Sequence, residues 1–337
     1  MKKLFACLLS GLLTLASLSS LAACTTLDKT PRVYSDSDYS VGDAVIENAV
    51  VDIVHIYWID GDVNVKMHEK NTIEISETSA KELNDDQFKV HYKYRAPTKA
   101  TDTGTLFVYY VASGDFDVSG YDKDVTILIP KVEGIYLGGH SDSANFHVDF
   151  DDVENTAQTI ILNTLTGNFD VQVDAASEIQ LGGQNNEDLM KNLKGHCNVD
   201  AKGRIRLLGI QMWFTSSTIN AAKIDALEGV GGKNPAIINV GELGTFERKS
   251  GLFDVKLSLK KFGKIKLGDL RGKAVLAFPL DLDFTLKIGA SVGFAYQDFE
   301  LEKSSENTYT NGKGGAEIGI ACQEYYKASV ELIPLEA

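Results

Sequence analysis

The chain has few cysteines and no cysteine pattern. It contains four in 337 residues, and Cys7 and Cys24 belong to the N-terminal segment. The other two, Cys197 and Cys322, are too far apart in sequence for a disulfide framework or a zinc site. We expect two isolated, buried thiols, and a bridge between them is the alternative.

The usual sequence signatures of enzymes are also missing. There is no G-x-S-x-G elbow, no glycine-rich loop with the Walker lysine, and no H-E-x-x-H. The paired glycines, such as Gly138-Gly139, are interpreted as turns, because a phosphate loop needs a following helix. We predict a protein without a catalytic site or cofactor. The alternative is a polysaccharide-active β-helix enzyme that works with paired carboxylates and an arginine.

Basic residues are outnumbered by acidic residues. The chain has 33 Lys and Arg against 47 Asp and Glu, which gives a net charge of −14. Nucleic-acid binding needs clustered Lys and Arg to neutralise phosphates. The composition therefore argues against nucleic acid as a partner and is typical of a solvated acidic surface.

Long apolar runs are absent after the first one. Lys2 and Lys3 precede the Leu-rich run 4–18, and small residues then lead to Leu21-Ala22-Ala23-Cys24. This is the pattern of a secretory signal peptide. Its end resembles the lipobox of bacterial lipoproteins, which implies cleavage before Cys24 and acylation of that residue with two or three chains. Such chains anchor a protein stably to a membrane.

The sequence therefore predicts three segments. Residues 1–23 form the lipoprotein signal peptide, and residues 24–44 form the lipidated cysteine with a polar, flexible tether. Residues 45–337 form the folded domain, which we expect outside the cytoplasm, held at the bacterial membrane by its anchor.

The dominant pattern of that domain is alternation of apolar residues in short runs separated by glycines. A unit at 111–118 (VASGDFDV) recurs loosely around Gly61, Gly167 and Gly251. We interpret its glycine as a turn, and Phe116 and Val118 as an apolar face that neighbouring coils cover. In 50–59 both alternating sets are apolar, which predicts a strand covered on both faces.

Several apolar positions recur at one constant spacing along the chain. They are Ile160 and Ile179, Ile205 and Ile224, and the series Ile238, Leu257 and Leu276. A strand that recurs about every 20 residues is typical of a stacked solenoid. We predict an all-β, right-handed, single-stranded β-helix or β-solenoid-like domain.

Two features qualify this prediction. Residues 186–194 have the cap and apolar stripe of one short inserted helix. The equal separation of Gly61, Gly114 and Gly167 fits hairpins as well as coils. A β-sandwich or two-sheet domain is therefore the alternative architecture.

Two regions resemble the putative-adhesin family of bacterial surface lipoproteins, a domain of unknown function with a β-solenoid fold. The resemblance is carried by IYWIDGDV at 56–63 and NTIEISE at 71–77, and by FTLK at 284–287, DFEL at 298–301 and NGKGG at 311–315. It implies a non-catalytic adhesion or envelope-scaffold role, with an unidentified surface protein or glycan as partner. A regulatory envelope lipoprotein is a further alternative.

Two sets of side chains are candidates for binding. His147, Asp149 and Asp151 share one strand face, and they are weak candidates for a divalent-metal site. We expect a solvated acidic face there instead, and no bound metal. Aromatic residues that would stack on sugars or on a partner, or else cover strand faces, are Tyr92, Tyr94, Tyr109, Tyr110, Tyr121 and Trp213.

Overall fold

The computed structural model is built almost entirely of β-strands. It describes residues 38–99, 101–114, 117–151, 158–164, 166–182, 195–210, 216–229, 236–248, 254–322 and 327–335. In these ranges 24 strands form one open sheet, and the helical element is the 3₁₀ turn η2 (Asp86–Phe88). This confirms the predicted all-β class. The signal peptide, Cys24, Trp213 and the helix expected near 186–194 lie outside the described residues.

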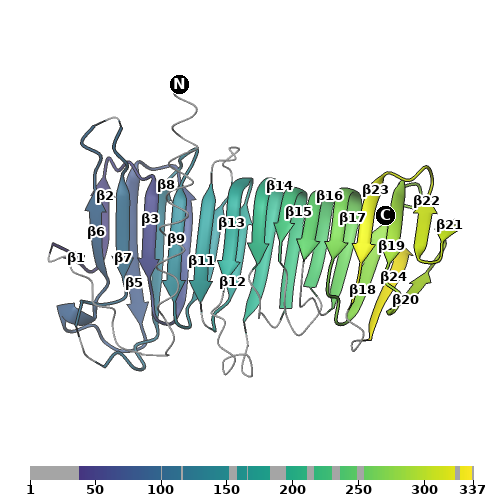
Figure 1. The fold of residues 1–337 in the computed structure, drawn as a ribbon. Coiled ribbons are helices and arrows are strands. Elements are labelled where there is room, and N and C mark those ends of the chain that lie inside the picture. Colours follow the sequence, from purple (N-terminus) through teal and green to yellow (C-terminus); the bar gives the residue numbers. More distant parts are fainter. Residues whose placement is uncertain are drawn as a thin grey trace.

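The sheet folds into two layers because four long strands each continue from one layer into the other (Figure 1). These strands are β14 (His196–Ile210), β15 (Ser216–Glu228), β16 (Ala236–Arg248) and β17 (Val255–Leu267). Their second halves belong to layer 1 and their first halves to layer 2.

In the part of the chain that the structure describes, no helix is long and apolar enough to span a membrane.

Layer 1 contains the second halves of β14–β17 and the strands β3 (Ile53–Tyr57), β7 (Thr105–Tyr109), β9 (Tyr136–Ser141), β11 (Thr159–Thr164), β13 (Ala176–Gly182), β19 (Phe284–Ile288) and β23 (Ala316–Ile320). Layer 2 contains the first halves and the strands β4 (Asp62–His68), β8 (Lys123–Pro130), β10 (Asn145–Phe150), β12 (Phe169–Val173), β18 (Lys273–Phe278), β20 (Val292–Tyr296) and β24 (Ala328–Pro334). Pairing within each layer is parallel.

Six further strands add to the ends of the layers in antiparallel pairs. They are β1 (Ser40–Val41), β2 (Ala44–Glu47), β5 (Thr72–Ser79), β6 (His91–Arg95), β21 (Glu302–Ser305) and β22 (Thr308–Asn311). Strand pairing therefore already includes Ser40 and Val41, which belong to the segment expected to form the tether.

The constant spacing of apolar positions corresponds to strand register. Ile160 pairs with Ile179, Ile205 with Ile224, and Ile238 with Leu257, which in turn pairs with Leu276. Each pair joins parallel strands of successive coils, so the stacked-coil prediction is confirmed for the body of the protein. Hairpins do not account for this region, because its neighbouring strands pair in parallel, although the sheet does form the two layers that the alternative two-sheet architecture expected. The right-handed sense of the winding stays a prediction.

The coils do not follow sequence order at either end. β3 and β4 form the first coil in the chain but lie between the coil β7–β8 and the coil β9–β10. At the other end, β23 and β24 come last but lie between β17–β18 and β19–β20. At each end, therefore, the coil next to the outermost one is supplied by a distant part of the sequence.

The recurring glycines lie at one corner of the coils. Gly61, Gly114 and Gly167 each lie between a layer 1 strand and the layer 2 strand that follows it. Gly61 has φ of 77°, and a Cβ there would lie 2.2 Å from the Lys123 carbonyl oxygen, so only glycine fits. Val111 and Val118 flank the second corner and are both buried, which confirms the interpretation of Val118 as a covered residue. Phe116 lies outside the described residues.

The core fills the space between the layers with alternate residues of each strand. In β3, Val54 and Ile56 are fully buried, whereas Ile53, His55 and Tyr57 are half-exposed. The prediction that this strand is covered on both faces is wrong, because each layer has only one face toward the interior. Cys197 and Cys322 are not joined by a disulfide; Cys197 is buried and Cys322 is half-buried.

Candidate binding face

Aromatic side chains gather on the outer face of layer 1, near the end where β1 and β6 lie. Strands β7, β3 and β9 lie side by side in register. Their inward residues are buried, so the alternate residues project outward. Together with one preceding residue they form a group that we call the aromatic strip: Tyr39, His55, Tyr57, Phe107, Tyr109 and Tyr136.

The rings of the strip stack across neighbouring strands. Tyr57 and Tyr109 are nearly parallel, with centroids 5.0 Å apart and 11° between the ring planes. His55 stacks on Phe107 at 5.2 Å. These separations match the distance of about 4.8 Å between strands. The rings therefore stand side by side and present edges and hydroxyl groups to solvent.

Tyr136 extends the strip onto β9, where Gly138 provides space. The ring centroids of Tyr136 and His55 are 5.6 Å apart. A Cβ on Gly138 would lie 3.0 Å from Tyr136 Cε1 and 3.2 Å from His55 Nδ1. Because glycine has no side chain, both rings can lie against the sheet at this point.

The strip is uncharged at neutral pH and has a cationic border. Burial lowers the pKa of His55, so its imidazole is neutral. Burial, followed by the effects of Tyr57 and Glu178, raises the pKa of Tyr136, which keeps its hydroxyl protonated. The Arg95 guanidinium lies 5.1 Å from the Phe107 ring centroid. The Lys93 Nζ lies 5.7 Å from the Tyr39 ring centroid. This side of layer 1 therefore combines neutral rings, hydroxyl donors and two bordering cations.

The outer face of layer 2 is different, because amide side chains link its strands. Asn145 donates to the Asp62 carboxylate at 2.8 Å, and Asn168 donates to the Asn145 side-chain oxygen at 2.8 Å. The Asn168 oxygen accepts from the backbone N–H of His196 at 2.6 Å. These bonds satisfy polar groups along one row of the layer.

The three metal candidates lie on this face, and each has another partner. His147 is 3.8 Å from a carboxylate oxygen on either side, one from Asp62 and one from Asp170. The Asp149 carboxylate is 3.8 Å from Lys66 Nζ, and the Asp151 carboxylate is 3.0 Å from Lys202 Nζ. Within the described ranges, no group of three His, Cys, Asp or Glu side chains is placed to hold a metal ion.

The aromatic residues that the sequence suggested for binding differ in position and burial. Tyr109 belongs to the strip, whereas Tyr110 is buried and its hydroxyl donates to Asp60. Tyr121 stacks on Phe88, and Tyr92 and Tyr94 pack against the core. Trp213 lies outside the described residues.

Sequence reasoning missed Tyr39, His55, Tyr57, Phe107 and Tyr136 as members of an exposed group. The four that lie on β3, β7 and β9 alternate with core residues, but the order of β7, β3 and β9 is needed to bring them together.

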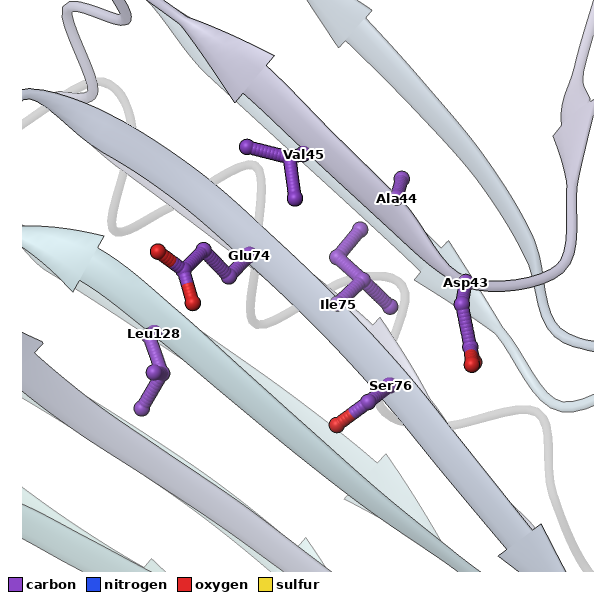
Figure 2. Close-up of a pocket in the computed structure, with 7 residues that line it drawn as sticks. All are labelled: Asp43, Ala44, Val45, Glu74, Ile75, Ser76 and Leu128. Carbon is purple, nitrogen blue, oxygen red and sulfur yellow. The ribbon is translucent and has the colours of Figure 1, made fainter.

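Two shallow hollows of the described surface bear on a possible site. One, of about 330 Å³, lies over β2, β5 and β8 (Figure 2). Its carboxylates are already engaged: Glu74 pairs with Lys70 at 2.8 Å, and Asp43 accepts from the Glu77 backbone N–H at 3.0 Å. The other, of about 240 Å³, surrounds Gly319 on β17, β19 and β23. Neither hollow is lined by an arginine together with paired carboxylates.

Comparison with known proteins gives little. No protein-family model matches the chain, and no curated protein sequence does. Solved structures that are similar to it include a putative cell adhesion protein from Clostridium sporogenes, with 12% identity and a TM-score of 0.25 over 88% of this chain and 100% of that chain. Another is a putative adhesin from Bacteroides fragilis, with 9% identity and a TM-score of 0.35 over 89% of this chain and 97% of that one. At TM-scores this low the likeness carries no argument about fold or function.

Proposed function

We propose that the protein is a non-catalytic binding module of the bacterial cell surface, anchored through lipid on Cys24, whose aromatic strip binds an extended glycan. The observation that carries the proposal is the strip itself. Six aromatic side chains lie half-exposed on one outer face of the sheet. A contiguous exposed group of this kind often marks an interaction site.

The chemistry of the strip fits a sugar chain. Tyrosine rings offer an apolar edge beside a hydroxyl that donates or accepts a hydrogen bond, and a sugar ring has the same combination of C–H and O–H groups. The strip is uncharged at neutral pH, so binding does not require the ligand to carry charge. Because the strands repeat about every 4.8 Å, the strip suits a ligand that lies across several strands.

An enzymatic role is less well supported. Glycoside hydrolysis needs a carboxyl group with a raised pKa as general acid. The carboxyl groups of Glu74, Asp86, Asp102 and Glu242 have pKa values that depart from the ordinary range, and all four are lowered. Each is held ionised by hydrogen bonds or by a nearby lysine. These groups are suited to ion pairs and turns.

The anchor is tested by cell fractionation. We expect the wild-type chain in the membrane fraction and the Cys24→Ala chain in the soluble extracytoplasmic fraction, because acyl chains supply the membrane affinity. Retention of Cys24→Ala in the membrane would contradict the lipid anchor. This test is independent of the binding face.

The binding face is tested with an array of neutral and acidic oligosaccharides. The double change Tyr57→Ala and Tyr109→Ala removes two stacked rings, and we expect affinity for the bound glycan to fall about tenfold or more. The matched control is Asn198→Ala with Thr218→Ala, which changes an in-register pair on the outer face of layer 2. Equal binding by both variants, with unchanged circular dichroism, would remove the strip as the site.

A further inference from the structure

The two layers have four end strands, and three of them are covered. β7 is covered by β6, β8 by β5, and β19 by β22, each in an antiparallel pair. β20 ends layer 2 at the other extremity of the molecule (Figure 1). In the described residues it pairs with β24 alone, so its second edge has backbone groups that no described strand satisfies.

β20 also lacks the features that protect exposed edges. Natural edge strands are kept from pairing with other chains by charge, proline, bulges or shortness. The neighbouring edge strand β21 (EKSS) is charged and fully exposed. β20 has the sequence VGFAY, and the whole segment 289–297 has neither charge nor proline. An uncharged strand of this kind is a template for another strand.

The core is incompletely covered beside this edge. Val292, Phe294 and Tyr296 are in register with Ala328, Val330 and Leu332, which are buried. Their side chains therefore belong to the interior side of the layer. Phe294 packs on Tyr309 with ring centroids 4.7 Å apart, but Tyr296 is 51% exposed. Another strand with an apolar face would cover these side chains.

We propose that a second copy of this chain occupies the edge, with the two β20 strands antiparallel and the two molecules end to end. Antiparallel pairing about Phe294 sets this residue opposite the same residue of the second copy, and Val292 opposite Tyr296. Every cross-strand pair is then apolar or small, which stabilises an antiparallel pair. A contact that complements itself in this way gives a closed two-fold dimer.

The distribution of charge allows two copies to meet at this end. The chain has a net charge of −14, so two copies repel each other over most of their surface. Residues 245–337, however, contain 13 Lys and Arg and 13 Asp and Glu. The part of the chain that forms the β20 end is therefore neutral, and the acidic excess lies further from the contact.

The arrangement has a consequence for adhesion that rests on the proposed lipid anchor. β1, next to the first described residue, lies at the opposite end of the elongated body from β20 (Figure 1). In an end-to-end pair the two N-terminal ends point away from each other. Two chains anchored at Cys24 therefore pair between facing membranes, so the protein joins surfaces that both carry it.

Sedimentation equilibrium of the full-length chain in density-matched detergent tests the pairing itself. We expect a monomer–dimer equilibrium. Gly293 and Ala295 lie on the outer side of β20, and a Cβ on Gly293 meets nothing closer than 3.7 Å, so lysines fit there. Gly293→Lys with Ala295→Lys sets lysines opposite each other, and we expect the dissociation constant to rise about tenfold or more. The control Ser329→Lys, one strand inward and in register with Gly293, leaves it unchanged.

The other outcomes overturn parts of the proposal separately. A monomer at all concentrations, or a dimer that persists in the double-lysine variant with an unchanged thermal midpoint, refutes the edge pairing. A monomer that binds a labelled peptide VGFAY through this edge replaces the second copy with an extended peptide. Vesicles that carry the lipidated chain should cluster, and the double-lysine variant should not cluster them. Dimers without clustering would refute the bridging geometry and leave the edge pairing intact.

Discussion

Lys123 and Glu77 form a buried ion pair, with Nζ 2.6 Å from a carboxylate oxygen and both side chains almost fully buried. The ammonium group also donates to the Phe88 carbonyl at 2.7 Å and lies 4.8 Å from the Tyr110 ring centroid. Burial lowers the pKa of Lys123 to about 8, and the Glu77 charge acts against that effect. The pair connects β8 to β5 and to the segment before β6. It therefore stabilises the packing of β5, the strand that covers the edge of β8.

Removing one member of the pair should destabilise the folded protein. Lys123→Met leaves the Glu77 charge buried and unpaired, and we expect a loss of about 3–5 kcal/mol in the free energy of unfolding. The double change Lys123→Met with Glu77→Leu should recover most of that loss, because no charge is left uncompensated. Urea denaturation of wild type, of Lys123→Met, of Glu77→Leu and of the double variant measures the coupling. A loss below about 1 kcal/mol for Lys123→Met, as for a surface pair, would show that water reaches the site.

His55 should make stability depend on pH. Its folded pKa lies below the ordinary value of 6.5, because burial disfavours the charged ring. As pH falls the unfolded chain takes up the proton first, so the stabilisation is complete above about 6.5 and is lost as pH falls through the folded pKa.

His55→Phe keeps a ring stacked on Phe107 and removes the titration, so the thermal midpoint should fall less between pH 7.5 and 5. His91, whose pKa burial also lowers, preserves part of the slope. Identical slopes for wild type and variant would contradict this account.

Two strand glycines of layer 1 should respond in opposite ways to alanine. A Cβ on Gly139 would lie 2.6 Å from Leu162 Cδ2 and 2.7 Å from Phe146 Cε1, both in the core. Gly139→Ala should therefore cost about 1–3 kcal/mol through overpacking. A Cβ on Gly319 meets nothing within 4 Å. Gly319→Ala should be neutral or stabilise by up to about 1 kcal/mol, and chemical denaturation checks both variants.

Divalent metals should not bind the His147 face. Asp149 forms an ion pair with Lys66, and Asp151 forms one with Lys202 on a different strand. The two carboxylates and the His147 imidazole therefore do not point toward a common position. Calorimetric titration with Ca²⁺, Mn²⁺ and Zn²⁺ should give heats of dilution alone. A saturable heat that disappears in His147→Ala would show that these residues rearrange around an ion.

The body of the fold could be predicted from sequence because its register is local. Successive coils are separated by a short and constant spacing, so paired apolar positions such as Ile238 and Leu257 stand out in a simple count along the chain. The glycines at the corners were found for a similar reason: a corner restricts the residue type at one position. Both signals come from steric requirements that act on neighbouring parts of the chain.

The ends and the aromatic strip could not be predicted in this way. His55 pairs with Phe107 and with Gly138, which lie much further along the chain than the next coil of a simple repeat would. No periodic pattern in the sequence predicts such pairings, because they depend on which strands β3 pairs with, and these are β7 and β9. Tyr57 and Tyr109 therefore appear in the sequence as two ordinary strand residues. Their proximity follows from coil order, which is a property of the whole fold.

The inserted coils make the order of folding differ from the order of synthesis. In a simple solenoid each new coil can add to the one before it, so contacts form as the chain emerges. Here β3 and β4 gain their neighbours on both sides only once β10 has been made, and β23 and β24 must enter between strands that precede them. Such non-local contacts have a high contact order and form slowly. A chain cut before Ala316 would therefore contain a gap between β17 and β19, whereas the same cut in a simple solenoid would only shorten it.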